Sequence, residues 1–217
     1  PVVGPWSNSQ SISIPPLFVG LHAVWQGTGA IVRTGGTEDF GYFWQEDITA
    51  LQPPHMGVTQ GRQWFDPNPA NWPTEQWSST YDLTSGAFLT TTLPADAAVQ
   101  WGHPWILPYD LSFHNVSAVS VGGEVFNVSG PHVGATAKGK PIRYWRLVNR
   151  DRFLYSDDGQ GEQHYVEPGA AILHYESDVT GLLLHVEITR HIWQHGKDTD
   201  DVIRYSLDLV DENVFRE

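Results

Sequence analysis

The stretch DVIRYSLDLV, from Asp201 to Val210, alternates apolar and polar residues along its whole length. Successive side chains of a β-strand point to opposite faces of a sheet, so this pattern predicts a strand with one buried and one wet face. The apolar face carries Ile203, Tyr205, Leu207 and Leu209, and the polar face carries Arg204, Ser206 and Asp208.

The preceding stretch GLLLHVEITRHIW, from Gly181 to Trp193, repeats the same pattern. One side carries Leu182, Leu184, Val186, Ile188 and Ile192, and the other carries His185, Glu187, Thr189 and His191. The polar connection QHGKDTDD, residues 194–201, is typical of a loop. The two stretches are therefore expected to form an antiparallel pair.

Short strand patterns recur along the chain, for example AAILHYE at 170–176 and IRYWRLVN at 142–149. Gly122-Gly123 and Asp157-Asp158-Gly159 are predicted turns between strands. The segments EDITAL and ADAAVQW are candidates for short helical turns. The predicted fold is all-β, a single antiparallel β-barrel or sandwich with long irregular loops. We expect residues 1–217 to form one domain and to be a fragment of a longer chain.

The composition argues against several classes of partner. The net charge is −13, and basic residues are not clustered as a phosphate-binding surface requires, so no nucleic acid or anionic membrane partner is expected. No apolar run reaches the ~18 residues of a membrane span. Cysteine is absent, which favours synthesis in a reducing compartment and removes thiol chemistry.

An aromatic group lies between Gln52 and Gly86, the stretch with the least regular pattern. Long connections without secondary structure are often functional. Two interpretations are open: the indoles pack over prolines as structural residues, or a rigid loop presents them to a receptor or glycan. The candidate receptor- or glycan-binding residues are Trp64, Phe65, Trp72, Trp77 and Tyr81.

Metal-binding and catalytic patterns are weak. His191 and His195 are four residues apart at the end of a strand, where such residues lie roughly 13 Å apart, so no metal site is predicted. Asp198, Asp200 and Asp201 lack the glycine and distal glutamate of a calcium loop, and an acidic hairpin loop is the better interpretation. No catalytic residue and no cofactor are predicted.

Acidic residues near aromatics raise a glycosidase as an alternative, since sugar cleavage uses paired carboxylates. The candidates are Glu46-Asp47, Asp157-Asp158 and Asp66. Asn115 and Asn127 begin Asn-Val-Ser tripeptides that match the glycosylation pattern, both in predicted strands. A protein made in the cytosol would leave both asparagines bare.

The chain resembles the surface spike of an astrovirus capsid protein, an avian one in particular. The resemblance is carried by the strand-rich segments FVGLHAVW (18–25), FGYFWQED (40–47) and IRYWRLVNRDRFLYSDDG (142–159), and by the ending VDENVFRE (210–217). The acidic, aromatic, cysteine-free composition is similar to that of a projecting capsid domain.

This resemblance implies a β-barrel-like core with long loops, homodimers on the virion surface, and synthesis in the host cytoplasm. It also implies attachment to a host cell-surface receptor, protein or glycan, recognition by neutralising antibodies, and no enzymatic activity. The alternative from a different class is a carbohydrate-active β-sandwich, either a sugar-binding module or a glycoside hydrolase.

Overall fold

The computed structural model describes residues 18–52, 55–65, 74–82, 88–92, 116–121, 123–135, 139, 141–176 and 182–212. Within these ranges the regular structure is entirely β, as the sequence predicts. The strands are β1 (His22–Arg33), β2 (Gly36–Gln52), β3 (His55–Phe65), β4 (Thr74–Asp82), β5 (Phe88–Thr91), β6 (Ala118–Val121), β7 (Glu124–Ala135), β8 (Pro141–Asn149), β9 (Phe153–Asp157), β10 (Glu162–Val166), β11 (Ala171–Glu176), β12 (Leu183–Gln194) and β13 (Lys197–Glu212).

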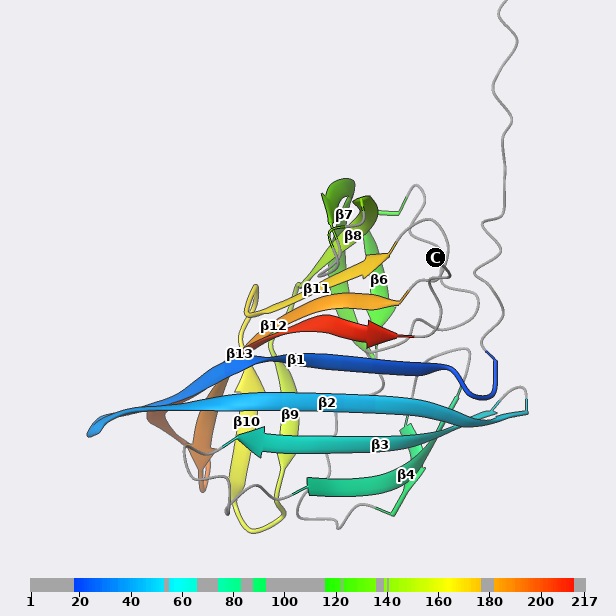
Figure 1. Cartoon of the computed structure of the whole chain (residues 1–217). Coiled ribbons are helices and arrows are strands. Elements are labelled where there is room, and N and C mark those ends of the chain that lie inside the picture. Colours follow the sequence, from blue (N-terminus) through cyan, green and yellow to red (C-terminus); the bar gives the residue numbers. More distant parts are fainter. Residues whose placement is uncertain are drawn as a thin grey trace, which may run out of the picture.

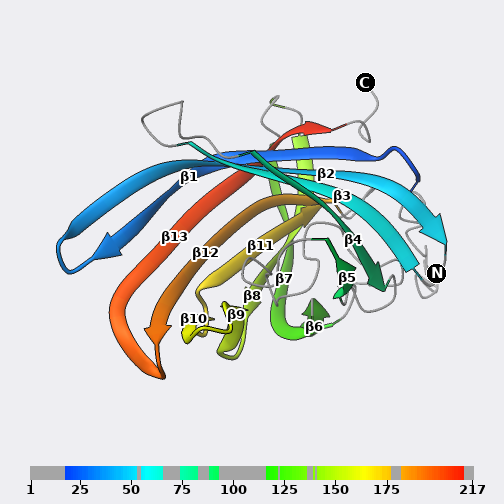
Figure 2. The ribbon, with the colours of Figure 1, turned by 90° about the horizontal axis from the view of Figure 1, so that it is seen from below.

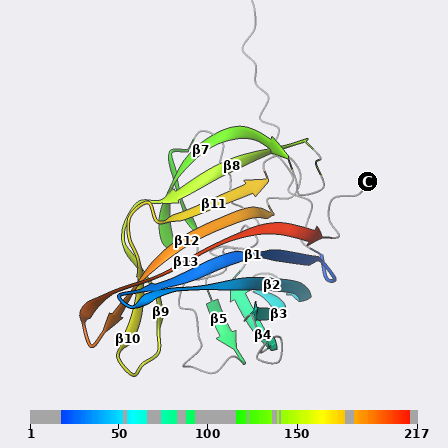
Figure 3. The same ribbon diagram turned by 60° about the vertical axis from the view of Figure 1, so that its left-hand side comes forward.

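These strands form one antiparallel sheet in the order β5-β4-β3-β2-β1-β13-β12-β11-β8-β7-β6. The hairpin β9–β10 lies off this path and pairs through β10 with the far end of β12. The sheet curls strongly, and β9 and β10 lie within its curve in Figures 1 and 2. Figure 3 shows the same curvature from the side, with β7 and β8 at one end and β3 to β5 at the other. The architecture is an open, curled half-barrel.

The face of the sheet that packs into the core is called here the inner face. In β13 it carries Ile203, Tyr205, Leu207 and Leu209, all buried, while Arg204 and Asp208 are exposed on the opposite, outer face. The alternation predicted for Asp201–Val210 is therefore confirmed. Apolar area removed from water stabilises a fold by roughly 25 cal/mol per Å², so this inner face supplies the main stabilising term.

The alternation predicted for β12 is confirmed with one shift. Leu182, Val186, Ile188 and Ile192 are buried, but Leu183 is fully buried as well and Leu184 only partly. The pairing of β11 with β12 shifts register between His174 and Tyr175, which places Leu183 opposite Tyr175. A bulge of this kind lets two neighbouring residues point toward the same side of a sheet.

The β12–β13 connection is shorter than predicted. His195 and Gly196 form the turn, both with positive φ (50° and 77°), and Lys197 already belongs to β13. Two central residues with positive φ match the twist of a β-hairpin, which explains why the polar run after them continues as strand. The predicted hairpins are present: Val121 at the end of β6 pairs with Glu124 of β7, and Asp157 of β9 pairs with Gln163 of β10.

Two predictions for the first half of the chain are wrong. EDITAL belongs to β2, which continues to Gln52, and forms no helical turn. Trp44 and Ile48 are both buried on one face of this strand, so the two-residue alternation of a strand extends through this segment. The stretch from Gln52 to Gly86 contains β3 and β4, which pair through almost their whole length. β3 pairs with β2 on one side and with β4 on the other, so both neighbours supply partners for its backbone N–H and C=O groups. The local sequence pattern does not reveal this pairing.

Glycine in β1 permits the close approach of neighbouring strands. A Cβ atom at Gly27 would overlap the carbonyl oxygen of Ser206 in β13. Glycine inside a strand often marks such a contact or a bend of the sheet.

ADAAVQW and Asn115 lie outside the described residues, and Asn127 lies in β7 as predicted. The described residues include no helix that is long and apolar enough to cross a bilayer.

Candidate ligand-binding site

The predicted aromatic site residues fall into different environments. Trp64 and Phe65 belong to the end of strand β3, and Trp72 lies outside the described residues. Trp77 and Tyr81 lie in β4 and are buried, with 7% and 6% of their surface exposed. A binding surface formed by the whole group therefore has no support from the described residues.

Trp77 packs edge-to-face against Trp44 of β2, with ring centroids 5.4 Å apart. Such pairs add roughly 0.5–1.5 kcal/mol beyond the area that they bury. Trp77 and Tyr81 thus act as core residues, as the structural interpretation of the aromatic group expects, and they offer a partner almost no surface. A binding role for Trp64, Phe65 and Trp72 stays a prediction.

A pocket of about 410 Å³ opens on the other side of the molecule, where β7, β8, β11, β12 and β13 run side by side. Ligand pockets in proteins commonly enclose about 300–1,000 Å³. Its lining residues are Gly134, Ala135, Ile142, Tyr144, His174, Leu184, His185, Asp208 and Leu209. Polar and aromatic side chains from the outer face therefore converge on one concave surface.

Four of these side chains and one neighbour form a cross-strand row that we call the ring ladder. It comprises His132, Tyr144, His174, His185 and Asp208, one residue from each of the five adjacent strands. The pairing registers produce it, since His132 lies opposite Tyr144, His174 opposite His185, and His185 opposite Asp208. Side chains opposite one another on one face of a sheet are in contact range.

The rings of the ladder lie close together. Ring centroids are 4.5 Å apart between Tyr144 and His174 and 5.0 Å apart between His174 and His185, each with 33° between the ring planes. At the end of the row, Asp208 Oδ1 lies 2.7 Å from His185 Nδ1. His185 and Asp208 thus form a hydrogen-bonded pair at the edge of the pocket.

Burial and charge keep the middle of the ladder neutral. Desolvation lowers the pKa of His174 from 6.5 to about 4, with further lowering by the nearby His185, Arg146 and His132. The Nε2 atom of His174 is buried and has no hydrogen-bond partner. The hydrogen bond from His185 lowers the pKa of Asp208. At neutral pH the middle of the ladder is therefore a neutral imidazole, that of His174, and its end is the Asp208 carboxylate.

The ladder is not arranged as a metal centre. No group of three His, Cys, Asp or Glu side chains in the described parts of the chain is placed to hold an ion. His174 and His185 stack through their ring faces, whereas shared metal coordination requires ring nitrogens that converge on one point. The residues Asp198, Asp200 and Asp201 belong to β13, so the acidic loop expected there is a strand.

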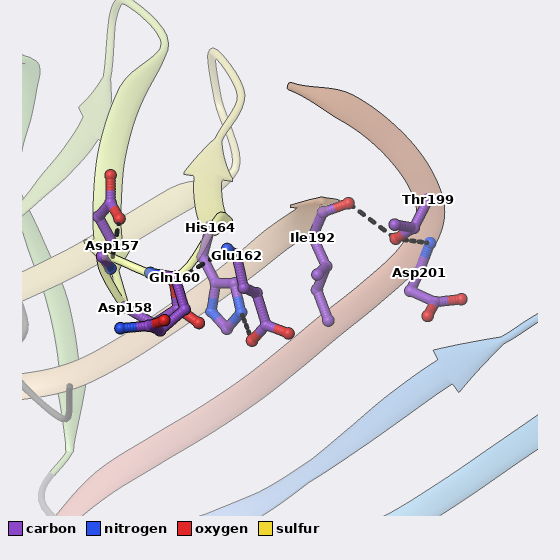
Figure 4. Close-up of polar contacts among 9 residues, drawn as sticks. Asp157, Asp158, Gln160, Glu162, His164, Ile192, Thr199 and Asp201 are labelled. Carbon is purple, nitrogen blue, oxygen red and sulfur yellow. Dashed lines mark hydrogen bonds and ion pairs between the residues drawn. The ribbon is translucent and has the colours of Figure 1, made fainter. Parts of the chain in front are cut away.

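Carboxylates named for the glycosidase alternative accept hydrogen bonds from other groups of the fold. Glu46 is completely buried and accepts a hydrogen bond from Trp44 Nε1 at 3.0 Å. Asp158 accepts hydrogen bonds from the backbone N–H groups of Gln160 and Glu162 at the β9–β10 turn, which lower its pKa (Figure 4). Asp66 lies outside the described residues.

Sequence reasoning places His185 on the wet face but does not predict the ring ladder. Its signal is a set of His, Tyr and Asp residues at outward positions of separate strands. Those positions align only when register and strand order are known, and β8 and β11 are neighbours here although two strands lie between them in sequence. The long-range pairing therefore decides the site.

No protein-family model matches the chain, and no curated protein sequence matches it. Among solved structures, a protein assigned as AttH from Nitrosomonas europaea matches over 91% of this chain and 52% of its own, with 13% identity and a TM-score of 0.26. A DUF1329 family protein from Desulfovibrio piger matches over 90% and 86%, with 7% identity and a TM-score of 0.25.

A domain assigned as an outer-membrane lipoprotein-sorting protein from Vibrio parahaemolyticus matches over 88% of this chain and 84% of its own, with 7% identity and a TM-score of 0.23. The chain spans about half the length of the AttH protein. All three TM-scores are too low to assign a shared fold, so neither fold nor function is taken from them.

Proposed function

We propose that the chain is a non-enzymatic recognition domain that binds a neutral, hydroxyl-bearing ring, such as a sugar unit of a glycan, in the pocket along the ring ladder. The observation that carries this proposal is the Asp208–His185 contact at the edge of a pocket of about 410 Å³. The Asp208 carboxylate favours a ligand that donates hydrogen bonds. Tyr144 adds a hydroxyl group that can donate or accept.

Charge supports a neutral ligand. Asp208 is the carboxylate among the described pocket-lining residues, and it would repel an anionic ligand from this pocket. A hydrolase of the common type needs two carboxylates flanking the scissile bond. A single lining carboxylate among the described residues favours binding over cleavage.

The biological setting that we propose is the one implied by the resemblance to capsid spikes. There the domain lies on a virion surface as a homodimer, attaches to a glycan or protein of the host cell, and carries antibody epitopes. Light scattering tests the pairing: a dimer is expected, and a strict monomer at high concentration would argue against a spike.

Binding is tested by saturation-transfer NMR with methyl glycosides of the common neutral and N-acetylated monosaccharides. Asp208→Asn is expected to weaken binding of the responding glycoside by roughly 10- to 150-fold, since removing a charged hydrogen-bond partner costs about 1.5–3 kcal/mol. Asp201→Asn, in the same strand but outside the pocket lining, is the matched control and should bind as the wild type does.

Two outcomes would overturn the proposal. One is that no glycoside of the panel binds to the wild-type protein. The other is that Asp208→Asn binds as tightly as Asp201→Asn. Release of nitrophenolate from nitrophenyl glycosides by the wild type, lost in Asp208→Asn, would favour the hydrolase alternative.

A further inference from the structure

Arg190 lies on the inner face of β12, between Ile188 and Ile192, and only 8% of its surface is exposed. Its guanidinium carbon is 4.5 Å from the ring centre of Tyr155 in β9 and 5.7 Å from that of Tyr205 in β13. The two tyrosine hydroxyl oxygens are 2.9 Å apart. Tyr155 belongs to the β9–β10 hairpin, which lies within the curve of the sheet (Figure 2).

This arginine has no counter-charge in the described parts of the chain. None of the ion pairs among those residues includes it, and its Nε atom is buried without a hydrogen-bond partner. A guanidinium group keeps its proton in proteins, so burial cannot neutralise it. The penalty for a buried, unpaired charge is several kcal/mol, whereas cation–π contacts return about 2 kcal/mol.

A second unpartnered nitrogen belongs to the same region. His164 of β10 lies opposite Ile192 in the strand pairing and bonds through Nε2 to Glu162 Oε1 at 2.9 Å (Figure 4). Its Nδ1 atom is buried and has no partner. Desolvation and the charge of Arg190 lower the pKa of His164.

We propose that Arg190 binds an oxyanion, a carboxylate or phosphate group, on the inner face beside Tyr155 and Tyr205. A guanidinium group presents its N–H donors in a planar fork that matches the two oxygens of either group. Ile188, Ile192 and Ile203 surround it on the same face with apolar side chains. These residues suit the aliphatic part of an amphiphilic acid. This site is separate from the ring ladder and does not depend on its function.

The experiment measures the melting temperature of the protein with sodium octanoate, sodium acetate or sodium phosphate, each against sodium chloride at equal ionic strength. At saturating anion a rise of about 5 °C is expected, since a ligand that binds only the folded state stabilises it. Stabilisation by octanoate alone identifies an amphiphilic acid as the ligand. Equal stabilisation by all three anions identifies a free oxyanion.

The matched variants are Arg190→Met and Arg204→Met. Arg204 lies on the outer face of β13, exposed and next to Tyr205 in sequence. Arg190→Met is expected to abolish the anion-dependent rise, and Arg204→Met to keep it. Should Arg190→Met not fold, Arg190→Lys retains the charge without the fork and is expected to weaken anion binding about tenfold.

Two results would overturn the proposal. One is that none of the three anions raises the melting temperature above the chloride control. The other is that the anion-dependent rise persists at full size in Arg190→Met or, where that variant does not fold, in Arg190→Lys.

Discussion

The two faces of β12 differ in the charge of the buried nitrogen-containing side chain next to them. On the outer side, His174 stacks on His185 of β12, and burial lowers the pKa of His174 to about 4, so its ring is neutral at pH 7. On the inner side, Arg190 is more deeply buried and keeps its charge. An imidazole can adapt to a dry environment by losing a proton, whereas a guanidinium group needs an anion. The two faces of one strand therefore carry the two sites that we propose, and these differ in their chemistry.

The largest expected effect is a loss of stability when a buried aromatic residue of the inner face is removed. Trp77→Ala should lower the free energy of unfolding by about 3–5 kcal/mol, because it removes a buried ring from its contact with Trp44 and leaves a cavity. Urea denaturation followed by fluorescence measures the change.

The control for this variant is Trp193→Ala, on a half-buried residue whose indole packs on Tyr165 and Arg152. Its expected cost is smaller, about 1–2 kcal/mol. Loss of ligand binding by Trp77→Ala with unchanged stability would instead restore Trp77 as a surface anchor.

The second prediction concerns the pH dependence of the outer face. Because the folded-state pKa of His174 is about 4 and its ordinary value is 6.5, the unfolded chain binds a proton in this interval that the folded chain does not. Stability is therefore complete above pH 6.5 and falls as the pH drops toward 4. The expected loss is about 1–2 kcal/mol after allowing for solvent screening of a half-buried ring.

His174→Phe keeps a stacking ring without a titrating group, so its stability should fall less between pH 6.5 and pH 4 than that of the wild type. Thr189→Val, on the outer face of the neighbouring strand β12, changes no titrating group and should keep the wild-type slope. His164 also has a lowered pKa, so the comparison of slopes assigns the His174 share. Asp208, whose pKa is lowered below 3.8, contributes only at more acidic pH. Identical slopes for His174→Phe and the wild type would contradict the assignment.

The sequence predicts the two faces better than it predicts the sites on them. Period-two alternation suffices to separate Leu207 from Asp208, because both positions obey a local rule. The contact of Asp208 with His185 and the approach of Tyr155 to Arg190 depend on which strands pair and in which register. Strand pairing depends on segments that are distant in sequence, so it produces no periodic pattern of residues within either strand.

The aromatic stretch shows the opposite error. Prolines, polar residues and tryptophans between Gln52 and Gly86 suggest a loop, yet β3 and β4 pair across most of this stretch. Cross-strand contacts override weak local propensity, as is common for β-structure. Trp77 is buried for the same reason, since its strand places it against Trp44.

The smallest predicted effect is a difference of about 1 kcal/mol between two glycine variants, and it tests how the β9–β10 hairpin is held. The tips of β9–β10 and β12–β13 meet where His195 N–H donates to the Gly161 carbonyl oxygen at 2.7 Å. A Cβ atom at Gly161 would lie 2.5 Å from Nδ1 of His195, and Gly161 has a φ of +109°. Gly161→Ala is therefore expected to cost about 2 kcal/mol, from backbone strain and displacement of the imidazole.

Gly159→Ala is the matched control, because Gly159 also has positive φ (+70°) but no atom within 4 Å of the added Cβ. It should cost about 1 kcal/mol from backbone strain alone. The difference between the two variants measures the contact between the tips. Tyr155 belongs to the same hairpin as Gly161 and packs on Arg190. Gly161→Ala is therefore also expected to weaken the anion-dependent rise in melting temperature, and Gly159→Ala is expected to preserve it. Equal behaviour of the two variants would mean that the tip contact does not position the hairpin.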